Sequence, residues 1–127
     1  CYPGRHGEMN LRSAEAQSCN VYFFQLAERL GENLLISEAR SFGMSQSPNI
    51  KLPRLRNSPN VPDPEWKRKR VGEKWALEDT FNVAIGQGGL RQSPLQMACF
   101  AAALANQNKN FLKEQRKLRN QSHRSFQ

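Results

Sequence analysis

The sequence lacks several features that would place it in a specialised class of proteins. It has only three cysteines in 127 residues, an odd number that indicates no disulfide framework. No apolar run is long enough to span a bilayer, and no stretch has the pattern of a secretory signal. Apolar residues make up only 38% of the chain. Because the chain begins at Cys1 without a methionine, we expect an internal fragment of a larger protein.

Acidic residues are also scarce relative to basic ones. The chain has 11 acidic and 19 basic residues, with a formal net charge of +8. Such a charge suits a nucleic acid or another anionic partner. However, much of it lies in the basic run 67–70 and in the segment 109–124, and no base-stacking aromatic residues interleave with these charges. A solvated surface is the simpler interpretation, and a small basic module that binds nucleic acid or an anionic surface stays as the alternative.

One helix is marked by strong start signals. Ser93 can accept an N–H group of the first turn, Pro94 fits the first helical position, and Gln96 completes a capping-box spacing. From Leu95 to Ala105 the sequence is apolar on nearly every side, which predicts an interior helix with neighbours all round. Such a helix needs a larger body than this chain offers.

Caps, apolar spacing and glycine stops predict three further helices. They extend from Asn10 to Gln17, from about Ser18 to Leu30 before Gly31, and from about Glu32 to Phe42 before Gly43. Leu26 and Leu30 are expected to share one face of the second of these helices, and Leu34 is expected to point inward from the third. Residues 44–74, rich in Pro and Arg, are expected to form a long irregular connection that Trp66 and Trp75 anchor in the core.

A glycine-rich turn, Gly86-Gln-Gly-Gly89, follows an apolar run that begins at Phe81. The plain interpretation is a tight corner that needs positive φ angles or close backbone contact. A phosphate cradle is the alternative, but the spacing matches neither G-x-G-x-x-G nor a P-loop.

Several segments resemble class B penicillin-binding proteins of the elongation type, the penicillin-binding protein 2 branch. They are Asn60-Val-Pro-Asp-Pro-Glu-Trp66, Gly72-Glu-Lys-Trp75, Ala84-Ile-Gly-Gln-Gly88, Ser93-Pro-Leu-Gln-Met-Ala98 and Ala102-Ala-Leu-Ala-Asn106. The resemblance implies an α/β transpeptidase fold with a central antiparallel sheet between helices. Residues 1–106 would be a partial transpeptidase domain of helices and a long connection that lacks most of the sheet, followed by a basic tail at 107–127.

The triplet Ser18-Cys19-Asn20 opens a segment similar to the one that carries the second active-site motif of this family. By that resemblance Ser18 would relay a proton during acylation, and Asn20 would bind the substrate's peptide group. The same resemblance assigns Gly86, Gln87 and Gly88 to substrate binding. A helix N-cap at Ser18 is the plain alternative. The S-x-x-K and K-T-G motifs are missing, so this chain alone should not acylate.

His6, Cys19 and Cys1 are candidate ligands of a structural zinc, which some members of that branch hold. A closed zinc site needs four ligands, so at least one would come from outside this chain. The alternative is that Cys19 is a small buried hydrophobe and His6 a surface turn residue. No cofactor is expected for catalysis.

The resemblance also implies what the parent protein does. It would cross-link peptidoglycan stem peptides that end in D-Ala-D-Ala through an acyl-serine intermediate, and β-lactams would inhibit it. Its partners would be membrane proteins of the elongation complex, with no nucleic acid. It would be anchored in the bacterial cytoplasmic membrane, with this domain on the outer side.

Overall fold

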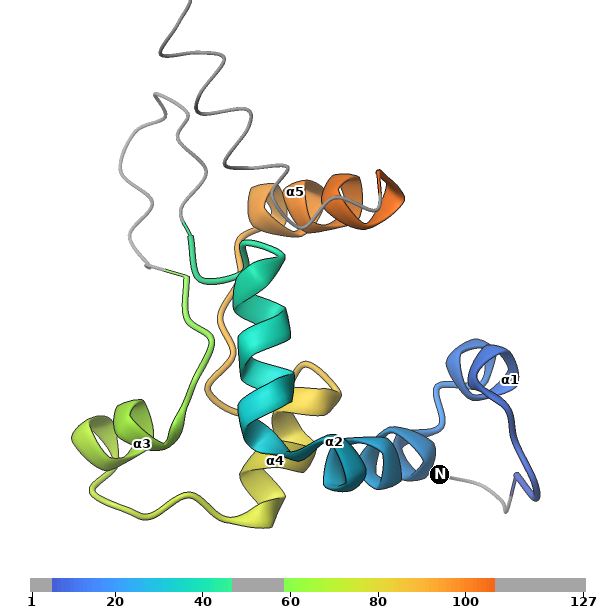
Figure 1. The fold of residues 1–127 in the computed structure, drawn as a ribbon, viewed down its shortest axis with the longest axis horizontal. Helices are drawn as coiled ribbons and strands as arrows, with labels where there is room; N and C mark the ends of the chain where they lie inside the picture. Colours follow the sequence, from blue (N-terminus) through green and yellow to red (C-terminus); the bar gives the residue numbers. More distant parts are fainter. Residues whose placement is uncertain (1–5, 47–58, 107–127) are drawn as a thin grey trace, which may run out of the picture. The chain divides into compact units, whose positions relative to one another are not determined.

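The structure, a computed structural model, describes residues 6–46 and 59–106 (Figure 1). Its helices are α1 (Leu11–Ala16), α2 (Asn20–Ser41), α3 (Pro64–Arg70), α4 (Leu77–Ala84) and α5 (Pro94–Ala105). Within these two ranges there is no β-strand, and the only ladder contact is an isolated antiparallel bridge between Asn60 and Arg91. The expectation of a mostly helical piece without the central sheet is confirmed. No helix in the described ranges is both long and apolar enough for a membrane crossing.

The chain divides into two compact units. Of the described residues, the first unit contains 6–36 and 62–90, and the second contains 37–46, 59–61 and 91–106. Helices α1, α3 and α4 and most of α2 therefore belong to the first unit, whereas the end of α2 and the whole of α5 belong to the second. The expected basic tail, residues 107–127, lies outside the described residues.

Two predicted helix starts are confirmed with their caps. Before α1, the Asn10 side chain accepts the Ser13 N–H at 3.0 Å, and the Ser13 hydroxyl accepts the Asn10 N–H at 3.1 Å. Before α5, the Ser93 hydroxyl accepts the Gln96 N–H at 3.2 Å, while Gln96 Oε1 accepts the Ser93 N–H at 2.9 Å. Each reciprocal pair satisfies backbone donors that a helix start leaves free, so the local sequence sets both boundaries.

The two helices predicted on either side of Gly31 are the two halves of α2. Gly31 interrupts the helical backbone with φ 75° and ψ 160°, a conformation that glycine adopts without steric strain. The second half ends at Ser41, and Gly43 follows with φ 84°. The Met44 N–H then donates to the Ala39 carbonyl at 3.2 Å, which closes the helix end. Both predicted glycine stops are confirmed.

The expectation that residues 44–74 are irregular is wrong over α3. Asp63 caps this helix by accepting the Trp66 N–H at 2.7 Å, and Pro64 occupies its first position. These start signals are local and strong. The high Pro and Arg content of residues 44–74 favours an irregular segment, and this composition hides the helix-start signal at Asp63 and Pro64. Residues 47–58 of this segment lie outside the described part.

The apolar run that begins at Phe81 is the second half of α4. The Asp79 carboxylate accepts the Ala76 N–H at 2.7 Å and so satisfies a free donor at the helix start. Thr80 and Val83, three residues apart, are the buried positions of α4. This spacing puts them on one helical face, which a short apolar run does not reveal.

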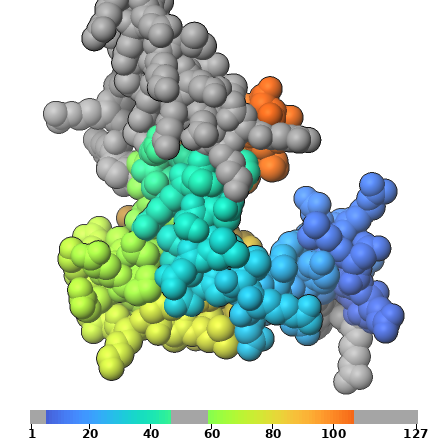
Figure 2. Space-filling view, viewed as in Figure 1, coloured from blue at the N-terminus to red at the C-terminus, as the bar shows by residue number. Residues whose placement is uncertain are grey.

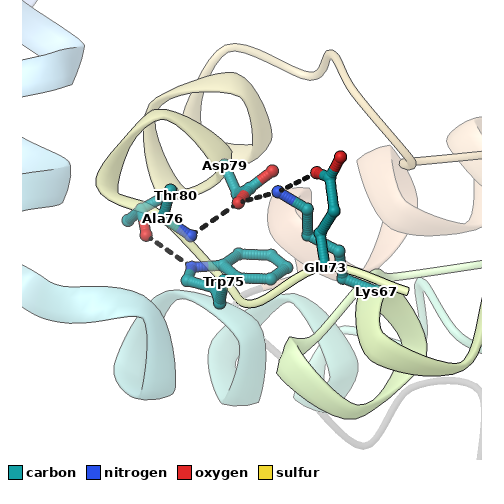
Figure 3. A network of polar contacts seen from close by, with 6 residues as sticks. All are labelled: Lys67, Glu73, Trp75, Ala76, Asp79 and Thr80. Atoms are coloured by element: carbon teal, nitrogen blue, oxygen red, sulfur yellow. Dashed lines mark hydrogen bonds and ion pairs between the residues drawn. The ribbon is translucent and has the colours of Figure 1, made fainter. Parts of the chain in front are cut away.

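A polar network links the end of α3 to the start of α4 within the first unit (Figure 3). Lys67 Nζ lies 2.7 Å from Asp79 Oδ2 and 3.5 Å from Glu73 Oε2. The Trp75 indole N–H donates to the Thr80 hydroxyl at 2.9 Å. The expectation that the tryptophans anchor this part of the chain is confirmed for Trp75, since Thr80 is buried.

Among the described residues, the buried side chains are few, and most of them are small. The buried apolar residues are Ala14, Cys19, Ala27, Ile36, Val61, Val83 and Ala103. By contrast, Met97 and Leu104 of α5 are 43% and 56% exposed, and Leu26, Leu30 and Leu34 of α2 are exposed as well. The expectation that Leu34 points inward is wrong in this chain. The exposed apolar side chains of α5 agree with the expectation that this helix needs a larger body than the chain offers. The described chain is too short to cover every face of these helices.

Two glutamines connect segments of the second unit. Gln92 Nε2 donates to the Met44 carbonyl at 2.7 Å, and Gln96 Nε2 donates to the Gln46 carbonyl at 3.1 Å. Gln96 is only 4% exposed. The side chain that completes the cap of α5 therefore also satisfies a backbone carbonyl that is distant in sequence, which accounts for a buried amide at this position.

Candidate active site

The triplet lies at the corner between α1 and α2, and Ser18 is the turning point. The Cys19 N–H donates to the Ala14 carbonyl at 2.8 Å, and the Ser18 N–H donates to the Glu15 carbonyl at 3.1 Å. This pair of bonds is the Schellman pattern of helix ends, in which glycine usually takes the left-handed position. Here Ser18 takes that position, with φ 50°.

The backbone at Ser18 is strained. A left-handed conformation costs an L-residue about 1–2 kcal/mol, and Ser18 is the only non-glycine residue with positive φ in the described chain. Its side chain is exposed, and its hydroxyl has no hydrogen-bond partner among residues 6–46 and 59–106. Strain of this kind is concentrated at functional sites. The corner thus presents an uncommitted hydroxyl to the solvent.

The helix cap at this corner is Cys19, so the plain interpretation of Ser18 as an N-cap is wrong. The Cys19 carbonyl accepts the N–H groups of Tyr22 at 3.1 Å and of Phe23 at 3.4 Å, the bonds that start α2. Ser18 lies one residue too early, at the end of α1. Sequence alone did not separate the two positions because serine is a far commoner cap than cysteine.

Cys19 is almost fully buried, with 5% of its surface exposed, and its thiol is hydrogen-bonded. A hydrogen bond with the His6 side chain, followed by one from the Tyr22 N–H, lowers the pKa of the Cys19 thiol, although burial acts in the opposite direction. The alternative interpretation of Cys19 as a small buried hydrophobe is confirmed for its burial, but it leaves out the hydrogen bonds of the thiol. Hydrogen bonds to the sulfur favour its thiolate form, the form that binds metals.

His6 is half-buried, and its Nδ1 atom is buried without a hydrogen-bond partner in the described part of the chain. His6 and Cys19 are therefore two adjacent nitrogen and sulfur donors, which suit zinc. No group of three or more His, Cys, Asp or Glu residues that could hold a metal occurs among the described residues. Cys1, the third predicted ligand, lies outside them.

The glycine turn is a tight corner, as its plain interpretation predicts. Gly86 and Gly88 have φ angles of 77° and 71°. The Gln87 N–H donates to the Asn82 carbonyl at 2.7 Å and closes the end of α4. A side chain on Gly89 would not fit, because its Cβ would lie 2.5 Å from the ring of Trp66.

Both amide side chains assigned to substrate contact are exposed. Asn20 occupies the first position of α2, and Gln87 lies between the two left-handed glycines of the turn. Ser18, Asn20 and Gln87 all belong to the first unit. No hydrogen bond connects these three side chains to one another within the described residues. Each of these three side chains is thus accessible to a ligand, and no hydrogen bond among them fixes their relative positions.

The basic run of α3 is balanced by acidic neighbours. Residues 62–90 contain five basic and five acidic side chains. Lys67 pairs with Asp79, and Lys69 pairs with Glu65 at 2.7 Å. In the space-filling view the yellow-green side chains around α3 protrude at the surface (Figure 2). This pattern is typical of a solvated helix and unlike the unbalanced positive surface that binds phosphates.

Comparison with known proteins decides the family. The model of the penicillin-binding protein transpeptidase domain matches residues 2–125. The chain belongs to this transpeptidase family. It is 37% identical over 101 residues to a protein named peptidoglycan D,D-transpeptidase MrdA from Acinetobacter baumannii, a match that covers 80% of this chain and 15% of that protein.

Two solved structures of penicillin-binding protein 2 agree with the family assignment. One, from Pseudomonas aeruginosa in complex with WCK 5153, has a TM-score of 0.70 and 34% identity over 77% of this chain and 22% of its own. The other, from Helicobacter pylori in complex with MreC, has a TM-score of 0.66 and 35% identity over 72% of this chain and 17% of its own. The expected transpeptidase fold is confirmed, and the chain spans about a fifth or less of the relatives it matches.

Proposed function

We propose that this chain is a segment of a peptidoglycan D,D-transpeptidase of the penicillin-binding protein 2 type, and that it supplies the second active-site motif. The observation that carries the proposal is the strained corner at Ser18, where an exposed hydroxyl without a partner in the described chain falls at the family's motif position. A fold that needed only a helix end there would be better served by glycine.

Ser18 would act as a proton relay. The nucleophilic serine and its lysine belong to S-x-x-K, which this sequence does not contain. When that serine attacks the D-Ala-D-Ala carbonyl, its proton must leave, and the departing amine must gain one. The Ser18 hydroxyl can accept one proton while it donates another, and so passes the charge along without holding it.

Asn20 and the glycine turn would bind the substrate. An exposed amide can donate to a peptide carbonyl and accept from a peptide N–H of a stem peptide. Gln87 offers the same groups, and Gly86 and Gly88 leave the backbone beside it free of side chains. β-Lactams would occupy the same place, because they present an amide carbonyl to the same nucleophile.

The partners and the location follow the family. A penicillin-binding protein 2 forms a complex with MreC in the Helicobacter pylori structure, and we expect this protein to join a similar set of elongation-complex membrane proteins. We place it at the cytoplasmic membrane with this domain on the outer side, where peptidoglycan is cross-linked.

His6 and Cys19 would supply two ligands of a structural zinc. The fit rests on a thiol of lowered pKa and on a buried Nδ1 without a partner in the described residues. Bound there, zinc would hold the loop before α1 against the start of α2, and it would take no part in the reaction. Zinc content of the metal-stripped and reloaded complete domain, compared with its His6→Ala variant, tests this assignment.

The test of the proposed function is Ser18→Ala in a complete transpeptidase that carries this segment. Acylation by a fluorescent β-lactam should slow by about 10²–10⁴-fold. The melting temperature should hardly change, because the hydroxyl makes no hydrogen bond in the described chain. A variant that acylates at the normal rate would return Ser18 to a purely structural role.

Ser13→Ala is the matched control. The Ser13 hydroxyl belongs to the cap of α1 and accepts the Asn10 N–H. Its loss should lower stability by about 1 kcal/mol while acylation stays normal. Ser18→Ala should lose acylation and keep its stability, whereas Ser13→Ala should lose stability and keep acylation. This contrast would distinguish a catalytic role of a serine from a helix-capping role.

A further inference from the structure

The glycine turn that presents Gln87 has little rigidity of its own. Gly86 and Gly88, on either side of Gln87, have φ angles of 77° and 71°, and glycine takes positive and negative φ about equally easily. On the side of α4 the turn is fixed, because the Gln87 N–H donates to the Asn82 carbonyl at 2.7 Å and the Gly86 N–H donates to the Val83 carbonyl at 3.1 Å. The direction of Gln87 therefore also depends on what holds the residues that follow it.

The other side of the turn lies against the ring of Trp66. A Cβ on Gly89 would lie 2.5 Å from Cη2 and 2.6 Å from Cζ3 of Trp66, and 3.2 Å from Cβ of Pro62. Distances this short mean that the backbone of Gly89 is in van der Waals contact with the far edge of the indole ring. Pro62 is fully buried. Gly89 thus occupies a corner between two rigid rings, where a side chain would not fit.

Trp66 is itself held in place by the start of α3. Its backbone N–H donates to the Asp63 carboxylate at 2.7 Å, and Pro64 occupies the first position of this helix. The Trp66 side chain is half-buried. The cap, the ring and the glycine turn all belong to the first unit. The ring is therefore a fixed support for the half of the turn that follows Gln87.

We propose that Trp66 is a positioning residue for substrate binding, whose ring supports the turn at Gly89 and so holds Gln87 where its amide meets the peptide groups of the substrate. The inference rests on the proposed function, because it takes Gln87 as a residue that binds the stem peptide. Trp66 touches no substrate atom in this scheme and acts only through the turn.

The test measures KM and kcat for release of D-Ala from a synthetic stem pentapeptide that ends in D-Ala-D-Ala, with the complete transpeptidase. Trp66→Phe keeps an aromatic residue in α3 but shortens the side chain, so the ring no longer reaches Gly89. It should raise KM by about 3–10-fold, the size of one lost hydrogen bond to the substrate. The value of kcat should hardly change, as expected where only binding is lost.

Trp75→Phe is the matched control. The Trp75 indole N–H donates to the Thr80 hydroxyl at 2.9 Å, so its loss removes a structural hydrogen bond from the same unit. This variant should melt at a lower temperature and keep a normal KM. A KM raised equally in Trp75→Phe and Trp66→Phe would overturn the proposal, because general loosening of the unit would then explain both.

Two double variants show how Trp66 acts. Gly89→Ala alone should raise KM, since its Cβ pushes the turn away from the ring. In the Trp66→Phe background the space is open, so adding Gly89→Ala should raise KM no further. If Trp66 acts through Gln87, Trp66→Phe should likewise raise KM no further once Gln87 is alanine. An equal rise with and without Gln87 would overturn the proposal.

The single variants separate this inference from the proposed function. A normal KM in Trp66→Phe together with a raised KM in Gln87→Ala would overturn the positioning role alone. A normal KM in Gln87→Ala would overturn the substrate assignment of the turn, and this inference with it. If Trp66→Phe does not fold, Gly89→Ala with and without Gln87→Ala carries the same test, because it breaks the same contact from the other side.

Discussion

Replacing Ser18 by glycine should stabilise the protein and inactivate it at the same time. Ser18 occupies a left-handed position with φ 50°, and its exposed hydroxyl makes no hydrogen bond within the described residues. Glycine accepts this backbone conformation without strain but removes the hydroxyl. Stability should therefore rise while acylation activity falls, and few substitutions at a proposed active-site residue would produce this combination.

The size of the stability effect follows from two terms. Relief of the left-handed strain contributes about 1–2 kcal/mol. The greater freedom of glycine in the unfolded chain offsets about 0.5–1 kcal/mol of this. The side chain is exposed, so no packing is lost. The net gain should be on the order of 0.5–1 kcal/mol, which raises the melting temperature by about 1–4 °C in a domain of ordinary size.

The assay combines a thermal melt with the rate of acylation by a fluorescent β-lactam, both on the complete transpeptidase. Ser18→Ala is the control, because alanine lacks the hydroxyl but keeps the strain. Both variants should lose acylation to the same extent, and only the glycine variant should melt at a higher temperature. A lowered melting temperature in Ser18→Gly would refute the reasoning, since it would mean that the serine is there for stability.

Two other predictions concern the first unit. A hydrogen bond with Asp79 raises the pKa of Lys67, so its stabilisation is complete below the ordinary lysine pKa of about 10.4 and is lost as pH rises through the higher folded value. Asp79→Asn should abolish this alkaline loss in thermal melts between about pH 9 and about pH 12, and an unchanged pH profile would contradict the role of the pair. Gly89→Ala should destabilise by about 1–3 kcal/mol and shift the tryptophan fluorescence, because its Cβ would lie 2.5 Å from the Trp66 ring; a normal melt would show that the ring moves aside easily.

Local sequence signals were sufficient wherever a boundary depends on neighbouring residues. The caps at Asn10 and Ser93 and the breaks at Gly31 and Gly43 are all confirmed. These features arise from hydrogen bonds over three to five residues and from the conformational freedom of glycine, both of which are visible in sequence. Asp63 and Pro64 give the same kind of start signal for α3, but the Pro-rich and Arg-rich composition of the surrounding residues favours a loop over a helix there.

Within the candidate site, the sequence by itself determined which residues carry the motif and left their geometry undetermined. It identified Ser18 and Asn20 by resemblance, but it placed the helix cap on Ser18 and not on Cys19. Which of three consecutive residues caps a helix depends on how the preceding helix ends, and that end is set by the bond from Cys19 to the Ala14 carbonyl. The left-handed backbone at Ser18 follows from this bond and not from any propensity of serine.

Contacts between distant segments were decided only by the tertiary structure. The pairing of Lys67 with Asp79, twelve residues apart, turned an apparently basic run into a balanced one. Met97 and Leu104 are exposed, although the apolar pattern of their helix predicts that they are buried. The described chain does not supply the residues that would cover them. A pattern states which surface a helix must cover, whereas the covering surface is made by other parts of the fold, whose position no local signal records.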